Sequence, residues 1–235
     1  MMREILSRNL TEVRERIAAA CGRAGRPPES VRLVAVTKTV GPEVIRLLPG
    51  LGVEDIGENR VQQARARREN LGGSLGLRWH MIGRLQTNKV RHALRLFEMI
   101  HSVDRFRLAE EIDRRAGRED RVVDVLVQCN TSGEETKAGV EDSELIRLLD
   151  RIMELEWVRV RGLMTMAPIV QRAEDARPYF AQLRRLAEKA RAATGLPLPE
   201  LSMGMTQDFE VAIEEGATMV RIGTAIFDGL QAQAH

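Results

Sequence analysis

Val31-Arg32-Leu33-Val34-Ala35-Val36-Thr37-Lys38 is a short apolar run that ends in a lysine. Its length and its β-branched residues are typical of a buried parallel strand. Lys38 stands where this strand ends and a loop begins, and functional groups in parallel-sheet proteins gather at such points. Taken alone, the lysine is most simply a charge that reaches for water. The rest of the chain decides between that interpretation and a functional one.

Seven further runs of this kind follow, separated by helical patterns. The eight predicted strands cover residues 31–37, 53–57, 78–83, 99–103, 122–129, 158–164, 198–203 and 218–222. An amphipathic helical pattern over 5–20 precedes the first strand. Alternation of this kind builds parallel sheets, and eight units in roughly 200 residues fit the lower size range of one barrel. We therefore predict an α/β fold, a (β/α)8 TIM barrel that spans residues 1–235 as a single domain with an extra N-terminal helix.

The alternative fold is an open, doubly wound sheet. No G-x-G-x-x-G sequence follows the first predicted strand, so the dinucleotide-binding fingerprint typical of that fold is missing. The sequence also contains no linker and no internal repeat. These observations favour the closed barrel.

Composition restricts the compartment and the partners. Hydrophobic residues make up 43% and charged residues 30%, as in an ordinary globular protein. The 36 Lys+Arg and 34 Asp+Glu leave a net charge of +2, too little to recruit nucleic acid or an anionic membrane. No stretch approaches the roughly 18 apolar residues of a membrane span, and the N-terminus does not resemble a signal peptide. Two distant cysteines make no disulfide framework, so we expect a cytoplasmic protein.

The functional site of a (β/α)8 barrel lies at the carboxyl ends of its strands. Polar and small residues gather at these predicted ends, whereas the strand bodies are Val, Leu and Ile. The ends are Thr37-Lys38, Glu58-Asn59, Gly83-Arg84, His101-Ser102, Asn130-Thr131, Thr165-Met166, Ser202-Met203-Gly204 and Arg221-Ile222-Gly223-Thr224. This arrangement predicts a ligand-binding mouth above a packed core.

The last two strand ends suggest a phosphate site. Phosphate in such barrels often binds to the loops after strands seven and eight, beside a short helix. Gly204 and Gly223 would let the backbone approach an anion, and Ser202 and Thr224 carry hydroxyl groups. Residues 225–227 could form the short helix. The simpler alternative is that both glycines only turn the chain.

A lysine able to form an imine, with a phosphate site across the same mouth, matches the needs of pyridoxal 5'-phosphate. Partial desolvation would favour the neutral, nucleophilic amine of Lys38. Arg221 lies two residues before Gly223, on the same strand face, and could contact the pyridine nitrogen. Because a guanidinium only donates, it would leave that nitrogen unprotonated and weaken the ring as an electron sink.

Seven motifs span nearly the whole chain: Val34-Ala35-Val36-Thr37-Lys38, Ile56-Gly57-Glu58-Asn59, Trp79-His80-Met81-Ile82-Gly83 with Leu85, Gln86, Asn88 and Lys89, His101-Ser102-Val103-Asp104, Arg161-Gly162-Leu163-Met164, Leu201-Ser202-Met203-Gly204-Met205 and Val220-Arg221-Ile222-Gly223-Thr224-Ala225-Ile226-Phe227. In these motifs the chain resembles the pyridoxal phosphate homeostasis protein family, the single-domain relatives of the alanine racemase N-terminal barrel. The resemblance implies a protein that holds pyridoxal phosphate and supports its supply without turnover of its own. It implies these cofactor-binding residues: Lys38 as the Schiff-base lysine, Asn59 beside the cofactor, Arg221 on the pyridine nitrogen, Ser202, Gly223 and Thr224 on the phosphate, with Met203 and Gly204 completing the site.

Two positions depart from the family pattern. Arg60 follows Glu58-Asn59 where the family usually has Tyr, and Asp228 interrupts the usual Ile-Phe-Gly ending before Gly229. Both positions flank the motifs. We therefore expect changes at the rim of the site and no loss of binding.

Two other functions stay open. A pyridoxal phosphate-dependent racemase or lyase would need a second acid–base group, which in this type of racemase is a tyrosine from a second domain. The sequence ends soon after Phe227, and Tyr179, its one tyrosine, falls in a predicted helix, so we expect no catalysis. A Schiff-base aldolase without cofactor would leave Arg221 without a role. We expect a monomer, with apo-enzymes that require the cofactor as its recipients.

The histidines and a basic run have simpler interpretations. The 4 histidines show no metal-ligand spacing and there are no paired cysteines, so we expect no zinc site. His80, inside an apolar strand, is expected to be a hydrogen-bonded core residue. Arg65, Arg67 and Arg68 are expected to form a solvated helix face.

The remaining candidates are methionines and one more lysine. Met164, Met166, Met203 and Met205 are expected to pack the mouth of the barrel, where Met203 or Met205 could touch a flat ring. Lys137, in the loop after the fifth strand, is expected to be solvated. The alternative for Lys137 is a second imine-forming amine.

Overall fold

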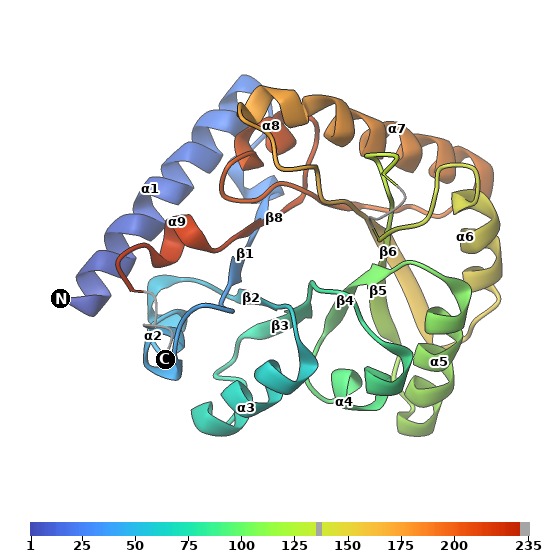
Figure 1. Ribbon diagram of the computed structural model, residues 1–235, viewed down its shortest axis with the longest axis horizontal. Helices are drawn as coiled ribbons and strands as arrows, with labels where there is room; N and C mark the ends of the chain where they lie inside the picture. Colours follow the sequence, from blue (N-terminus) through green and yellow to red (C-terminus); the bar gives the residue numbers. More distant parts are fainter. Residues whose placement is uncertain (135–137, 231–235) are drawn as a thin grey trace.

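Eight parallel strands close into a barrel in the computed structural model, which describes residues 1–134 and 138–230 (Figure 1). The strands pair in chain order, and the last closes on the first with Arg32 opposite Met219 and Ala35 opposite Ile222. The strands are β1 (Arg32–Val36), β2 (Asp55–Glu58), β3 (Arg78–Met81), β4 (Met99–Val103), β5 (Val123–Gln128), β6 (Val158–Met164), β7 (Glu200–Ser202) and β8 (Met219–Ile222). The predicted (β/α)8 barrel is confirmed, and the open sheet is wrong.

Helices follow the strands and form the outer ring (Figure 1). They are α2 (Pro42–Ile45), α3 (Val61–Leu71), α4 (Val90–Leu94), α5 (Phe106–Ala116), α6 (Leu145–Met153), α7 (Arg177–Thr194), α8 (Phe209–Glu214) and α9 (Thr224–Phe227), with short 3-10 turns at 28–30, 49–51, 87–89, 117–119 and 173–176. The helix after β1 is one turn long. It ends where the hydrogen bonds tighten to the 3-10 type, with Leu47 N–H bonded to the carbonyl oxygen of Val44 and Leu48 N–H to that of Ile45.

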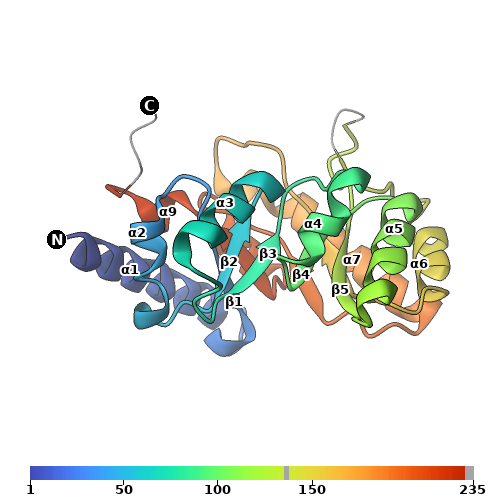
Figure 2. The same cartoon turned by 90° about the horizontal axis from the view of Figure 1, so that it is seen from below.

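The extra N-terminal helix is α1 (Met2–Arg23), which lies along the outside of the barrel beside α8 and α9 (Figure 1, Figure 2). Its apolar face is buried, as its helical periodicity predicted. The buried Asn9 donates through Nδ2 to the carbonyl oxygens of Ile226 at 3.1 Å and Asp228 at 3.0 Å. The helix therefore holds the segment that follows β8 against the barrel.

Two hydrophobic clusters pack on the two faces of the strands. The large one lies between the strands and the helices and includes Ile56, Trp79 and Ile222. The small one consists of Met99, Leu126, Met164 and Met219. His101 on β4 is hydrogen-bonded to Ser202 on β7, a strand that β4 does not pair with, so these side chains lie inside the barrel. Met99 shares the strand face of His101, which places the small cluster inside as well.

The barrel interior is more polar than expected. The sequence predicted strand bodies of Val, Leu and Ile, but Asp55, His80, His101 and Arg221 are all buried strand residues. Their side chains replace part of the branched aliphatic layers typical of such barrels. Within the described parts of the chain, no helix is both long and apolar enough to cross a membrane.

Candidate functional site

A cavity of about 360 Å³ lies at the carboxyl ends of the strands. Its volume falls in the range of small-molecule sites. Five of the eight predicted site residues line it: Lys38, Asn59, Arg221, Gly223 and Thr224. They come from the ends of β1, β2 and β8, which are neighbours around the barrel. The closed sheet therefore brings together residues that lie far apart in the sequence.

Lys38 follows β1, and its carbonyl oxygen is bonded to Arg67, the first of three side chains that are hydrogen-bonded in series. Arg67 on α3 donates from Nη2 to the carbonyl oxygen of Lys38 at 2.7 Å and from Nη1 to Glu58 Oε2 at 2.7 Å. Thr37 Oγ1 donates to the other oxygen of Glu58, Oε1, at 2.5 Å. We call Thr37, Glu58 and Arg67 the Lys38 clamp. The side chain of Lys38 itself is exposed, so the partial desolvation expected from the sequence is not found.

The Lys38 clamp contains a buried carboxylate. The side chain of Glu58 is 0% exposed, and that of Arg67 is 17% exposed. Burial raises the pKa of Glu58, while the charge of Arg67 and the hydrogen bond from Thr37 oppose that shift. Arg67 and Thr37 thus both favour the ionised form of Glu58, which burial alone would disfavour.

The predicted solvated face of α3 is wrong for two of its three arginines. Arg67 belongs to the Lys38 clamp, and Arg68 lies over the ring of Trp79, 5.9 Å from its centroid. Only Arg65 behaves as predicted, since it forms an exposed ion pair with Glu69 one turn along the helix. Helical spacing showed that this face of α3 is polar, but it did not show that the buried carboxylate of Glu58 lies next to it.

Arg221 forms the floor of the cavity and is 3% exposed. It donates from Nη1 to Ser202 Oγ at 2.5 Å and from Nη2 to the carbonyl oxygen of Thr165 at 2.8 Å. Burial lowers the pKa of Arg221 to about 10, and the charge of Asp208 opposes that shift. Among the described residues, no carboxylate forms an ion pair with Arg221. A buried guanidinium with further N–H groups beside a cavity is suited to an acceptor atom of a ligand.

Three predicted site residues lie beneath the cavity and not on its wall. Ser202 is fully buried, and its hydroxyl is bonded to Arg221 and to Nδ1 of His101. Met203 is fully buried too. Gly204 has φ +90°, and a Cβ there would lie 2.6 Å from the Cβ of Ala212, so its glycine permits the packing of α8. The next residues of this loop, 205–207, line the cavity instead.

Two glycines permit close contacts around the cavity. A Cβ on Gly83 would lie 2.3 Å from the carbonyl oxygen of Asn59, so only glycine leaves room for the backbone of Asn59. A Cβ on Gly223 would lie 3.2 Å from the carbonyl oxygen of Val36, where β8 meets β1. These contacts fix the position of Asn59 and of the turn before α9.

Asp208 is a cavity residue that the sequence interpretation missed. It is 6% exposed, and its Oδ1 accepts the backbone N–H of Met205 at 2.6 Å. Burial raises the pKa of Asp208, while that N–H and the charge of Arg221 oppose the shift. The sequence did contain a signal that Asp208 lies at the cavity. Asp208 comes four residues after Gly204, in the loop that was expected to bind phosphate.

The other candidates fall into place around the cavity. Met166 and Met205 line it, whereas Met164 and Met203 are fully buried below. His80 is buried with both ring nitrogens hydrogen-bonded, as predicted. Among the described residues no group of three potential metal ligands occurs. Lys137 lies outside the described residues.

The two departures from the family pattern lie at the periphery. Arg60 is exposed and lines a smaller cavity of about 190 Å³ with Arg84 and Lys89. Asp228 is exposed, and its carbonyl oxygen accepts a hydrogen bond from Asn9. Neither residue lines the cavity that contains Lys38.

Sequence comparison gives strong matches over nearly the whole chain. The family model for the alanine racemase N-terminal domain matches residues 9–231. A protein of Aquifex aeolicus named pyridoxal phosphate homeostasis protein is 50% identical over 93% of this chain and 95% of its own length. A protein of the same name from Escherichia coli K12 is 39% identical over 94% of this chain and 95% of its own.

Solved structures agree with the sequence matches. PipY of Synechococcus elongatus PCC7942, solved with PLP bound, is 38% identical to this chain and superimposes with a TM-score of 0.82, covering 94% of this chain and 99% of PipY. Alanine racemase of Clostridium difficile 630 superimposes with a TM-score of 0.76 at 15% identity, over 95% of this chain and 56% of the racemase. The second likeness concerns the fold alone.

Proposed function

Because the chain belongs to the pyridoxal phosphate homeostasis protein family, within the alanine racemase N-terminal domain family, we propose that it binds pyridoxal 5'-phosphate and takes part in the intracellular homeostasis of this cofactor. The observation that carries the proposal is the cavity at the barrel mouth. It has the amine of Lys38 on one side and the buried guanidinium of Arg221 on its floor. The PLP-bound structure of the related PipY supports the same conclusion.

The residues of the cavity fit the groups of this cofactor. When bound, the cofactor supplies an aldehyde carbon, with which Lys38 would form a Schiff base. Arg221 would donate to the ring nitrogen, since a guanidinium has no acceptor and its remaining N–H groups adjoin the cavity. Gly223 and Thr224 would contact the phosphate, and Asn59 would lie beside the ring. Ser202, Met203 and Gly204 would support this site from below.

We propose that the protein holds the cofactor and does not turn over a substrate. Ionisable side chains on the described wall of the cavity are Lys38, Asp208 and Arg221. Tyr179 lies in α7 and does not line the cavity. A racemase or lyase is the alternative, and it would need Asp208 as its second acid–base group, because Asp208 is the carboxylic acid on the described wall of the cavity.

The site assignment is tested by mass spectrometry after borohydride reduction of the protein with bound pyridoxal phosphate. We expect the wild-type protein to be yellow and to carry the reduced adduct on Lys38. Lys38→Ala should lose the adduct, whereas Lys189→Ala, at an exposed position of α7, should keep it. A full adduct in Lys38→Ala, for example on Lys137, would overturn the assignment.

Turnover is tested separately. The loaded protein is incubated in deuterated water with single enantiomers of amino acids, and deuterium at Cα is measured. We expect no exchange above that of free pyridoxal phosphate. Rapid exchange that Asp208→Asn abolishes would establish the racemase or lyase alternative.

We also propose that the chain is a monomeric, single-domain cytoplasmic protein that passes the cofactor to apo-enzymes. Cys21 and Cys129 are both free and buried, which agrees with a reducing compartment. Light scattering gives the oligomeric state. Activation of a pyridoxal phosphate-dependent apo-enzyme behind a dialysis membrane, compared with direct mixing, tests whether transfer needs contact.

A further inference from the structure

Five buried side chains are hydrogen-bonded in succession through the interior of the barrel. Asp55 Oδ1 bonds to His80 Nε2 at 2.7 Å, and His80 Nδ1 bonds to His101 Nε2 at 2.9 Å. His101 Nδ1 bonds to Ser202 Oγ at 3.0 Å, and Ser202 Oγ bonds to Arg221 Nη1 at 2.5 Å. We call this series the interior chain. It joins β2, β3, β4, β7 and β8 and ends at the floor of the cavity.

The two ends of the interior chain determine its direction. The guanidinium of Arg221 can only donate, so Ser202 Oγ accepts from it. The carboxylate of Asp55 can only accept, so His80 carries a proton on Nε2. With both imidazoles neutral, His101 donates from Nε2 to His80, and the hydroxyl of Ser202 donates to Nδ1 of His101. Every hydrogen bond then runs the same way, from Arg221 to Asp55.

The opposite arrangement satisfies fewer groups. If His101 donated from Nδ1, Ser202 Oγ would receive two donors, and its own proton would have no acceptor among the described residues. His80 would also have to carry a second proton. Burial lowers the pKa of His101 well below its usual value, and the nearby charges of Arg221 and Arg32 lower it further, so His101 stays neutral.

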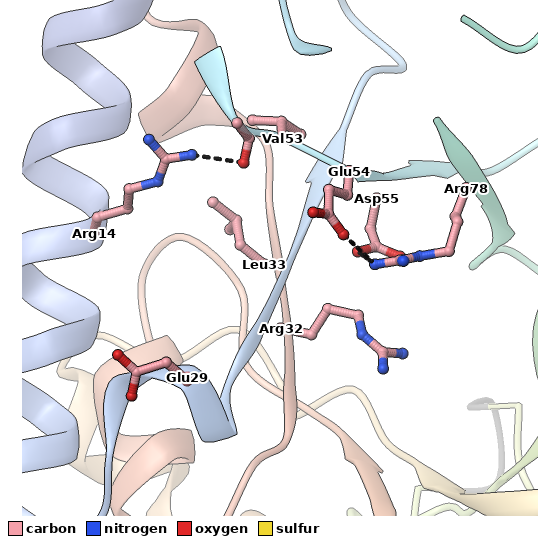
Figure 3. A pocket seen from close by; sticks show the side chains of 9 residues that line it. Arg14, Glu29, Arg32, Leu33, Val53, Glu54, Asp55 and Arg78 are labelled. Atoms are coloured by element: carbon pink, nitrogen blue, oxygen red, sulfur yellow. Dashed lines mark hydrogen bonds and ion pairs between the residues drawn. The ribbon is translucent and has the colours of Figure 1, made fainter. Parts of the chain in front are cut away.

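The far end of the interior chain reaches a charged cavity at the amino ends of the strands. Figure 3 shows this cavity, where Arg78 meets both Asp55 and Glu54. Arg78 donates to Asp55 from Nε at 2.8 Å and from Nη2 at 2.6 Å. Burial raises the pKa of Asp55, but the hydrogen bonds from Arg78 and His80 outweigh that effect and lower it to about 2. Asp55 is therefore a carboxylate throughout the neutral pH range.

We propose that Asp55, His80, His101 and Ser202 are positioning residues that lock Arg221 as a donor pointing at the barrel mouth. In the one-way order the hydroxyl proton of Ser202 points to His101 and away from the cavity. A lone pair of the hydroxyl oxygen accepts the hydrogen bond from the guanidinium of Arg221. Ser202 then acts on the cofactor through Arg221 and not as a hydroxyl donor to phosphate. A guanidinium fixed in this way keeps the ring nitrogen of a bound cofactor unprotonated. This consequence rests on the proposed function, whereas the one-way order does not.

The first test uses the protein without cofactor. Nitrogen-15 NMR correlations of the histidine rings distinguish the Nε2–H tautomer, the Nδ1–H tautomer and the doubly protonated ring. His92→Gln and His235→Gln together leave the signals of His80 and His101. We expect the neutral Nε2–H tautomer at both rings at neutral pH. An Nδ1–H tautomer at His101, or a doubly protonated ring at either position, would overturn the one-way order.

The second test uses bound pyridoxal phosphate. Ser202→Ala removes one of the two acceptors of Arg221, leaving the carbonyl oxygen of Thr165, and should raise the dissociation constant by about tenfold, the effect of one hydrogen bond to a charged group. It should also shift the visible absorbance maximum, because the ring nitrogen can then be protonated. Ser102→Ala removes another buried hydroxyl, one bonded to Gly83 outside the interior chain, and should leave the maximum unchanged. Equal spectra of Ser202→Ala and wild type would refute the link to Arg221, whereas a wild-type protein that binds no cofactor would refute the proposed function instead.

Discussion

Replacement of Arg67 by alanine tests whether the Lys38 clamp stabilises the carboxyl end of β1. The variant leaves Glu58, whose side chain is 0% exposed, without its cationic partner, and it frees the carbonyl oxygen of Lys38. Removing one member of a buried ion pair costs about 3–5 kcal/mol. Since the Arg67 side chain keeps 17% exposure, water can partly replace it, and we expect a loss of about 2–3 kcal/mol in the free energy of unfolding.

Arg65→Ala is the matched control on the same helix. Arg65 pairs with Glu69, and both side chains are about 60% exposed. Such exposed pairs contribute little to stability, because water screens the two charges. Urea unfolding of the two variants gives both losses in the same assay, provided that the slope with denaturant is unchanged. If Arg67→Ala were no more destabilising than Arg65→Ala, the clamp would have no structural role.

The pH dependence of the same variant provides a second check. Burial already raises the pKa of Glu58, and loss of Arg67 removes the main effect that opposes this rise. A folded-state pKa above the unfolded one means that the folded protein binds the proton more tightly, so acidification favours folding. The difference in the free energy of unfolding between wild type and Arg67→Ala should therefore become smaller as the pH falls toward the pKa of Glu58. A difference in the free energy of unfolding that grows on acidification would show that the unpaired carboxylate of Glu58 is not the cause of the destabilisation.

Three further predictions concern other residues. The pKa of Asp55 is lowered from its usual 3.8 to about 2, so its ionised form stabilises the fold above the usual pKa, and this contribution is lost as the pH falls toward 2. Asp55→Asn should therefore cost about 2 kcal/mol at neutral pH and flatten acid unfolding. Gly83→Ala should displace Asn59, lower stability by about 1–3 kcal/mol and weaken cofactor binding, whereas Gly22→Ala, with open space around it, should not destabilise. Arg221→Glu should protonate the ring nitrogen of bound cofactor and shift its absorbance; an unchanged spectrum would count against contact.

The barrel could be predicted from the sequence because most of its strands are short apolar runs bounded by turn residues. Even β7, with three residues, was expected within residues 198–203. The position of Lys38 at the mouth followed from the same pattern, since the carboxyl ends of parallel strands meet at one end of the barrel. These conclusions need only hydrophobic patterning, which the local sequence carries.

The partners of individual polar side chains could not be predicted in this way. Ser202 was expected to contact phosphate because it ends a strand, but the side on which a strand-end residue points depends on how the barrel closes. Arg67 was expected in solvent because its neighbours on α3 are charged, and its partner Glu58 lies on another element. Both cases depend on contacts between segments distant in sequence, which periodicity within one element does not report.

β2 supports both sides of the cavity, although it contributes only the residue that follows it, Asn59, to the wall. Asp55 and Glu58 lie three positions apart on this strand, so their side chains point to opposite faces. On the inner face, Asp55 starts the interior chain that leads to Arg221. On the outer face, Glu58 anchors Arg67 and, through it, the backbone of Lys38. Two buried carboxylates on one short strand are costly unless each is paired, and here each pairing orients one of the two basic groups that adjoin the cavity.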